Sequence, residues 1–173
     1  MPFRAAALTA TFAATIPAAN WLIGNVGTEC IPDGPCLVPV GFGYLAPSGV
    51  LMVGTALVLR DMVQEAGGIR AALAAIAIGG VLSWMVVPTA LVVASVAAFL
   101  LAELVDLAIY TPLRERRLAI AVLVSGIVGS IVDSAVFLWR AFGTLEFIEG
   151  QIIGKAWLSI LAVPLIRLMR RLA

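Results

Sequence analysis

Asp133 and Lys155 are ionisable residues inside two long apolar stretches of the chain, residues 118–142 and 151–168. If each stretch is a membrane-spanning helix, the rise of 1.5 Å per residue places both side chains about 6–8 Å below the same membrane face. A charged group at that depth needs an opposite charge, a polar cavity or water beside it. We therefore expect the two residues to pair or to line a cavity, with simple helix packing as the alternative.

Polar and aromatic residues extend this pattern along both stretches at helical spacing. The first stretch carries Ser130, Asp133, Phe137 and Arg140, and the second carries Gln151, Lys155 and Ser159. Two such stripes on consecutive helices most simply face each other. Their chemistry is hydrogen-bonded recognition, because ammonium and guanidinium groups donate hydrogen bonds and carboxylates accept them.

A third stripe lies within residues 88–110 and contains Phe99, Glu103, Asp106 and Tyr110. Its carboxylates need counter-charges, and the nearest basic residues on that side of the membrane are Arg60, Arg114 and Arg116. Asp106 fits a role in helix packing. Glu103 fits packing and a cavity wall equally well.

Catalytic and metal-binding signatures are missing from the sequence. There is no histidine, and the acidic residues are dispersed over different depths instead of clustered for magnesium. No serine-hydrolase elbow, zinc-protease motif or phosphate-binding loop is present. We expect no enzyme activity, no metal and no cofactor, and an intramembrane enzyme is the least supported reading.

The elements that position these residues follow from composition. The chain is 62% apolar with a mean hydropathy of +1.12, and 12% of its residues are charged, against about 25% in soluble domains. Six apolar stretches can cross a hydrocarbon core of about 30 Å: residues 5–26, 43–59, 70–87, 88–110, 118–142 and 151–168. We predict an all-α polytopic membrane protein whose residues 1–173 form one integral membrane domain.

Basic residues collect in alternate connections, which by the positive-inside rule places both termini in the cytoplasm. The connections on the other side contain acidic residues and no Lys or Arg. Arg140 and Lys155 flank one of these outside loops and break the pattern. The other outside loop contains Cys30 and Cys36, for which the sequence leaves open a disulfide or two free thiols.

Four segments resemble, in order and spacing, the VUT family of six-span bacterial membrane proteins: LVLRDMVQEAGG, SVAAFLLAELVDLAIYTPLRERR, VSGIVGSIVDSAVFLW and GQIIGKAW. The resemblance runs over residues 41–168. It implies uptake of queuosine precursors, 7-deazaguanine bases with a cyano or aminomethyl group, across the bacterial inner membrane. Gly126 departs from the family, whose members often carry Asn there, and this puts the substrate range in question.

The span count is also similar to that of the substrate-binding subunits of energy-coupling-factor vitamin transporters. In those subunits an alanine ridge on the first span docks the energising module. Ala6, Ala10, Ala14 and Ala18 form such a ridge here. Because the chain has no ATPase motif, coupling to ATP would need a partner.

From the residues and the resemblance together, we predict an importer that binds a deazapurine or vitamin-like molecule between the fourth, fifth and sixth spans. The predicted substrate-binding residues are Asp133, Lys155, Glu103, Arg140, Gln151, Phe137, Asp106 and Tyr110. The expected partners are the small-molecule substrate and the lipid bilayer, without nucleic acid, while a homodimer or a coupling module stays open. The alternatives are the binding subunit of an ATP-driven vitamin importer and a structural scaffold without ligand.

Overall fold

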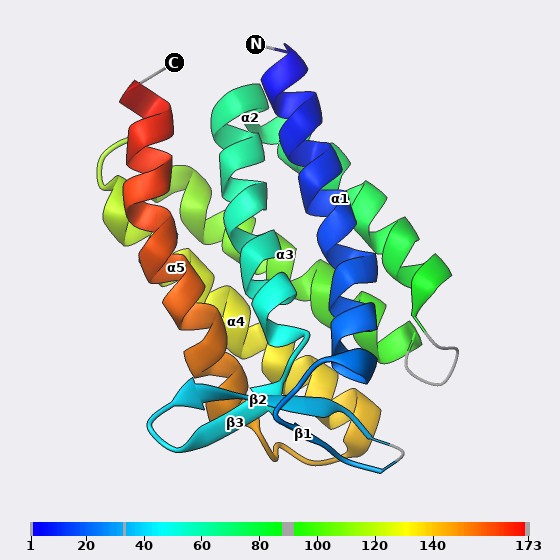
Figure 1. Cartoon of the computed structure of the whole chain (residues 1–173). Helices are drawn as coiled ribbons and strands as arrows, with labels where there is room; N and C mark the ends of the chain where they lie inside the picture. Colours follow the sequence, from blue (N-terminus) through cyan, green and yellow to red (C-terminus); the bar gives the residue numbers. More distant parts are fainter. Residues whose placement is uncertain (1, 33, 88–91, 172–173) are drawn as a thin grey trace.

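The computed structural model describes residues 2–32, 34–87 and 92–171, which form a bundle of long helices with a small β-sheet at one end (Figure 1). The helices are α1 (Pro2–Asn25), α2 (Val50–Val86), α3 (Val92–Leu113), α4 (Leu118–Phe142) and α5 (Ile148–Arg171). The strands are β1 (Glu29–Cys30), β2 (Cys36–Gly41) and β3 (Tyr44–Pro47). The start of α1 and the end of α5 lie at the same end of the bundle, opposite the sheet (Figure 1). We call these two ends of the bundle the terminal end and the sheet end.

Within the described residues, five helices are long and apolar enough to cross a membrane. Their outward faces carry large exposed apolar side chains, such as Leu161 at 65% and Val81 at 61% exposure. The buried residues include Arg60, Glu103 and Lys155. An apolar exterior around a partly polar interior is the arrangement that a lipid environment favours. The chain is therefore a multi-pass membrane protein.

Helix α2 is interrupted at Gly68, which has φ 75° and ψ −177°. Glycine adopts positive φ at little cost because it lacks a Cβ atom. The chain turns back here (Figure 1). Consistent with a turn, Ala75 from the second half shares a buried cluster with Leu59 and Val63 from the first half.

The predicted span boundaries differ from the helices in two places. The stretch 43–59 was predicted as one span, but the helix begins at Val50, and it continues as α2 through the predicted span 70–87. The stretch 88–110 corresponds to α3, which ends later, at Leu113; its predicted start, residues 88–91, lies outside the described residues. The ranges 5–26, 118–142 and 151–168 coincide closely with α1, α4 and α5.

The three strands form an antiparallel sheet in the order β1-β2-β3, where the sequence suggested only a loop and a helix start. Pro39 and Pro47 disfavour a helix over these residues. Strands β2 and β3 are joined by Phe42 and Gly43 with φ of 53° and 80°, the positive angles that a two-residue hairpin turn requires. Cys30 lies opposite Cys36 in the sheet and forms a disulfide with it, which answers the question that the sequence left open.

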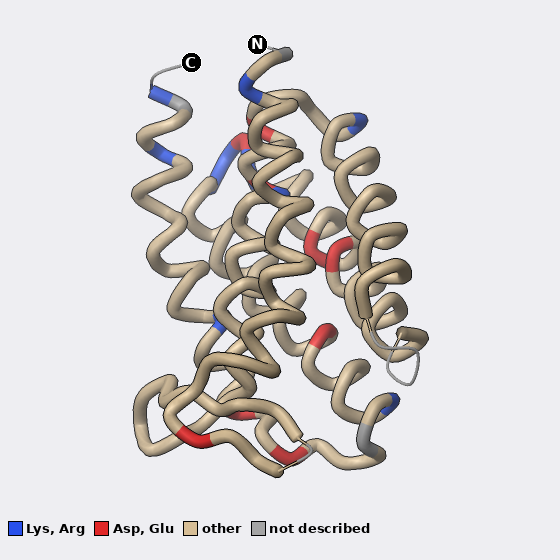
Figure 2. The backbone as a smooth tube through the Cα atoms, turned by 45° about the vertical axis from the view of Figure 1, so that its right-hand side comes forward, with Lys and Arg blue, Asp and Glu red and all other residues tan. Residues whose placement is uncertain are grey.

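Charged residues are distributed unevenly along the bundle. Figure 2 shows most Lys and Arg segments toward the terminal end, whereas acidic segments occur at both ends and in the middle of the bundle. Glu29 in β1 and Glu146 in the loop before α5 are exposed at the sheet end. This asymmetry agrees with the distribution of basic residues along the sequence.

The contact between the sheet and α5 generates a stability prediction. A Cβ atom at Gly150 would collide with the backbone carbonyl oxygen of Leu45 in β3. Because a backbone atom cannot rotate away, we expect Gly150→Ala to cost about 1–3 kcal/mol and to lower the melting temperature of the purified protein in detergent.

Gly24→Ala is the matched control, since a Cβ at Gly24 would meet nothing within 4 Å. This variant should keep or raise the melting temperature, because alanine favours a helix over glycine by about 0.5–1 kcal/mol. Equal melting temperatures for both variants would contradict close packing of the sheet on α5.

Candidate functional site

A cavity of about 130 Å³ lies inside the bundle. This is roughly ten times the space that one buried water needs, so the cavity has room for a small organic molecule. All five helices contribute to its walls, and Pro47 and Gly49 line it where the chain passes from β3 to α2. Its polar lining residues are Thr15, Asn20, Ser83, Ser95, Glu103, Asp133, Gln151 and Lys155.

A second cavity of about 340 Å³ adjoins the first. The two share Asn20, Ile23, Ser95 and Phe137 as lining residues. The second cavity extends to Trp21 near the end of α1 and to Val86 and Val87 at the end of α2. The internal space therefore continues toward the sheet end of the bundle.

One side of the central cavity is formed by a network around Lys155, which is 1% exposed. Its ammonium group lies 2.5 Å from Oδ2 of Asp133, and it donates further hydrogen bonds to Ser134 (2.8 Å) and Gln151 (3.3 Å). The predicted Asp133–Lys155 pair is thus present. Asp133, with 14% of its side chain exposed, is the more accessible partner. We call Lys155, Asp133, Ser134 and Gln151 the Lys155 network.

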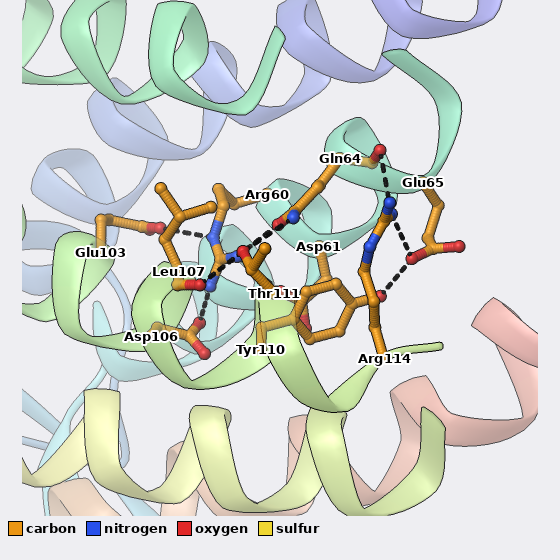
Figure 3. Close-up of polar contacts among 10 residues, drawn as sticks. All are labelled: Arg60, Asp61, Gln64, Glu65, Glu103, Asp106, Leu107, Tyr110, Thr111 and Arg114. Carbon is orange, nitrogen blue, oxygen red and sulfur yellow. Dashed lines mark hydrogen bonds and ion pairs between the residues drawn. The ribbon is translucent and has the colours of Figure 1, made fainter. Parts of the chain in front are cut away.

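A second set of ionisable residues surrounds Arg60, which is fully buried (Figure 3). Its guanidinium group contacts Asp61 at 2.9 Å, Glu103 at 3.2 Å and the carboxylate of Asp106. Side-chain exposure in all three acids is 3% or less. We call Arg60, Asp61, Glu103 and Asp106 the Arg60 cluster. Arginine suits this position because its planar group offers several N–H donors in fixed directions.

Neighbouring side chains extend the Arg60 cluster toward the terminal end (Figure 3). Gln64 accepts a hydrogen bond from Arg60 (3.3 Å) and donates one to Thr111 (2.9 Å). The Arg60 guanidinium also lies 5.6 Å from the centre of the Tyr110 ring. These contacts hold α2 against α3.

Glu65 continues these polar contacts toward the terminal end. It accepts hydrogen bonds from the Tyr110 hydroxyl and from Arg114, both at 2.9 Å. The Arg114 side chain is 23% exposed, so the polar contacts reach the accessible surface there. Arg60 therefore pairs with Glu103 and Asp106, as predicted. Arg114, also predicted as a counter-charge for these two acids, pairs with Glu65 instead.

Glu103 belongs to both polar regions, because it contacts Arg60 and also lines the central cavity. Neither Asp61 nor Asp106 is among the residues that line the cavity. Glu103 is thus the member of the Arg60 cluster that a molecule in the cavity can reach.

The structure brings together five of the eight residues predicted for binding: Asp133, Lys155, Gln151, Glu103 and Phe137 all line the cavity. Asp106 and Tyr110 are buried behind Glu103 in the contacts of Arg60. Arg140 lies exposed in the last turn of α4 and does not line the cavity. Arg140 lies on the same helical face as Asp133, but the cavity does not extend as far as Arg140.

Two features of the site were missed in the sequence. Arg60 was considered only as a nearby counter-charge, although it is the centre of a buried cluster. The cavity was placed between α3, α4 and α5, yet α1 and α2 also line it, through residues such as Thr15 and Met52. Because Thr15 is neutral and lies in an alanine-rich helix, nothing in the surrounding sequence marked it as a cavity-lining residue.

Gly126 has a packing role in this structure. A Cβ atom at this position would collide with the Ser159 hydroxyl of α5, and Gly126 is not among the residues that line the cavity. The glycine permits the close approach of α4 and α5. An effect of Gly126 on the substrate range would therefore act through the spacing of α4 and α5.

The fold and the cavity define a polytopic membrane protein with a charged internal chamber, an architecture suited to moving a small molecule. A family model described as "Putative vitamin uptake transporter" matches residues 83–169, half of the chain. The chain belongs to this family. The match includes Glu103, Asp133 and Lys155, while α1 and Arg60 lie outside it. No curated protein and no solved structure matches the chain.

The Asp133–Lys155 pair generates the second prediction. Removing one partner of a buried ion pair leaves an uncompensated charge and typically costs about 3–5 kcal/mol. We therefore expect Lys155→Met and Asp133→Asn each to lower the melting temperature in detergent. The double variant should lose less than the two single losses added together, because neither charge is then left alone.

Arg167→Met and Glu146→Gln, at exposed positions, are controls that should leave the melting temperature nearly unchanged. Strictly additive losses in the double variant would mean that the two charges do not stabilise each other.

Proposed function

We propose that this protein imports a queuosine precursor or a similar purine-like base and binds it in the central cavity. The observation that carries this proposal is the set of Glu103, Asp133 and Lys155 on the wall of one cavity in a vitamin uptake transporter. A scaffold needs no internal chamber with charged walls. The proposed location is the bacterial inner membrane, with both termini in the cytoplasm.

The cavity matches the hydrogen-bonding groups of a deazaguanine. Such a base presents ring N–H and amino donors on one edge, and a carboxylate accepts two donors well. Asp133 is suited to this edge because part of its side chain is open to the cavity. The Gln151 amide accepts from Lys155 through its oxygen, and its NH2 group would donate to the ring carbonyl.

Aromatic side chains suit a flat ring. Phe99 and Phe137 both line the cavity, from α3 and α4, and ligand sites are commonly walled by such apolar groups. Trp157, by contrast, donates its Nε1–H to Val40 and stacks on Phe42. Trp139 is 63% exposed. We therefore assign ring contacts to the two phenylalanines.

We propose that the chain crosses the membrane six times. The start of α1 and the end of α5 lie at one end of the bundle (Figure 1), which supports an even number of crossings. We propose that the two halves of α2 on either side of Gly68 cross separately. The cavity would then open alternately to the sheet end and to the terminal end.

One feature favours a second function, the substrate-binding subunit of an ATP-driven vitamin importer. Ala6, Ala10 and Ala14 are exposed on α1, and Ala18 is half-buried. Small residues at this spacing allow close approach of another helix. Under this alternative, an ATPase module copurifies with the protein, and Ala10→Trp together with Ala14→Trp removes it.

Ligand binding gives the third prediction. A thermal-shift series with 7-cyano-7-deazaguanine, guanine and common vitamins should show stabilisation by the deazaguanine, increasing with concentration as RT ln(1 + [L]/Kd). No stabilisation by any of these compounds would support the scaffold instead.

Uptake gives the fourth prediction. Asp133→Ala and Lys155→Ala should abolish uptake of labelled 7-cyano-7-deazaguanine by cells, because each removes a hydrogen-bonding group from the cavity. Glu146→Ala and Arg167→Ala, at exposed sites, are the matched controls and should transport normally. Full uptake by both cavity variants, at equal membrane protein levels, would refute the proposed binding site.

A further inference from the structure

We propose that import is coupled to protons and that Glu103 is the residue that binds and releases the transported proton. This inference rests on the proposed function, since it assumes a substrate in the central cavity. It concerns the source of energy, which neither the family nor the cavity specifies.

The first observation is the charge count in the Arg60 cluster. One guanidinium faces the carboxylates of Asp61, Glu103 and Asp106 (Figure 3). With all groups ionised, the cluster carries two surplus negative charges in a space from which solvent is excluded. Uncompensated buried charge is so costly that a group neutralises instead. At least one of the three acids must therefore hold a proton for part of the time.

Glu103 is the acid best placed to exchange that proton. It lines the cavity, while Asp61 and Asp106 do not. It also makes the longest of the three contacts with Arg60, 3.2 Å. When Glu103 takes up a proton and becomes a neutral carboxylic acid, Arg60 keeps Asp61 and Asp106 as its counter-charges. The guanidinium is thus compensated in both states.

Charged groups on the surrounding helices shift the balance between the ionised and protonated forms of Glu103. Arg60 from α2 favours the ionised form, while Asp61, Asp106 and Asp133 favour the protonated form. Lys155 from α5 lines the same cavity and is held by Asp133. From α1 the cavity is lined by the neutral Thr15 and Asn20. A substrate that takes Asp133 as its hydrogen-bond partner would change this balance at Glu103.

Glu103 lies between the cavity on one side and the hydrogen-bonded residues around Arg60 on the other, and these two features extend toward opposite ends of the bundle. The cavity and its neighbour extend toward the sheet end. On the other face, Arg60 connects through Gln64 to Thr111, and Glu65 with Arg114 follows toward the terminal end (Figure 3). Glu103 can therefore take a proton from the cavity and release it on the terminal side after a conformational change. The step is one proton bound and one proton released, with no change in oxidation state.

The experiment uses the purified protein in liposomes, with labelled 7-cyano-7-deazaguanine as the probe. An inward proton gradient should raise the initial rate and the final accumulation, and a protonophore should remove this gain. For one proton per base, a gradient of one pH unit supports up to about tenfold accumulation. Glu103→Gln should show no response to the gradient, measured as the ratio of its uptake with the gradient to its uptake without it. Glu146→Gln, at an exposed loop position, should respond like the wild type.

Each outcome decides a different point. Uptake by the wild type that ignores the gradient overturns proton coupling and leaves the importer intact. A gradient response that survives in Glu103→Gln overturns the role of Glu103. If the wild type neither binds nor moves the base, the proposed function fails, and the proton site is then tested alone by infrared spectroscopy. The C=O stretch of a protonated carboxylic acid should appear in pH-difference spectra of the wild type and vanish in Glu103→Gln; no such change would overturn the proton site.

The variant is suited to this test because glutamine keeps the size of glutamate and removes one charge from a cluster with surplus negative charge. We expect Glu103→Gln to keep or raise the melting temperature in detergent. A variant that fails to insert would itself contradict the charge count, since it would show that the negative charge on Glu103 is required throughout.

Discussion

The burial of Arg60 is the constraint on which the arrangement of the interior depends. A guanidinium keeps its charge under all physiological conditions, so a fully buried arginine inside an apolar bundle must have carboxylates against it. Asp61 comes from the same helix, and Glu103 and Asp106 come from α3. The need for counter-charge therefore fixes the register between α2 and α3. Since Glu103 also lines the cavity, the same contact sets one wall of the chamber.

The two polar groups differ in their charge balance, and this difference explains their different proposed roles. Lys155 and Asp133 form one cation and one anion, with the remaining hydrogen bonds of the ammonium taken by Ser134 and Gln151. Such a balanced network can hold a fixed geometry and is suited to recognition of a neutral base. The Arg60 cluster has more acids than bases. An unbalanced cluster is better suited to a change of protonation than to a fixed binding geometry.

Sequence reasoning located the parts of the site that depend on depth within a single helix. The helical rise placed Asp133 and Lys155 at one level, and their contact follows from it. It failed where the outcome depends on how far the cavity extends along a helix, as for Arg140, which shares a helical face with Asp133 but does not line the cavity. It also failed for the short sheet, because the run from Cys36 to Pro47 is as apolar as a span. There, the turn at Phe42 and Gly43 and the prolines outweighed hydropathy.

The interruption of α2 at Gly68 determines where the second half of this helix lies in the bundle. A continuous α2 of 37 residues would extend to about 55 Å, far beyond a hydrocarbon core of about 30 Å. The positive φ at Gly68 turns the chain back, so that the second half lies beside the first and Ala75 packs near Val63. The same turn carries the end of α2 back toward the sheet end, where Ser83 and Val86 contribute to the two cavities. A helix that ran straight on at this point would remove one wall of the chamber, because those residues would then lie beyond the terminal end of the bundle.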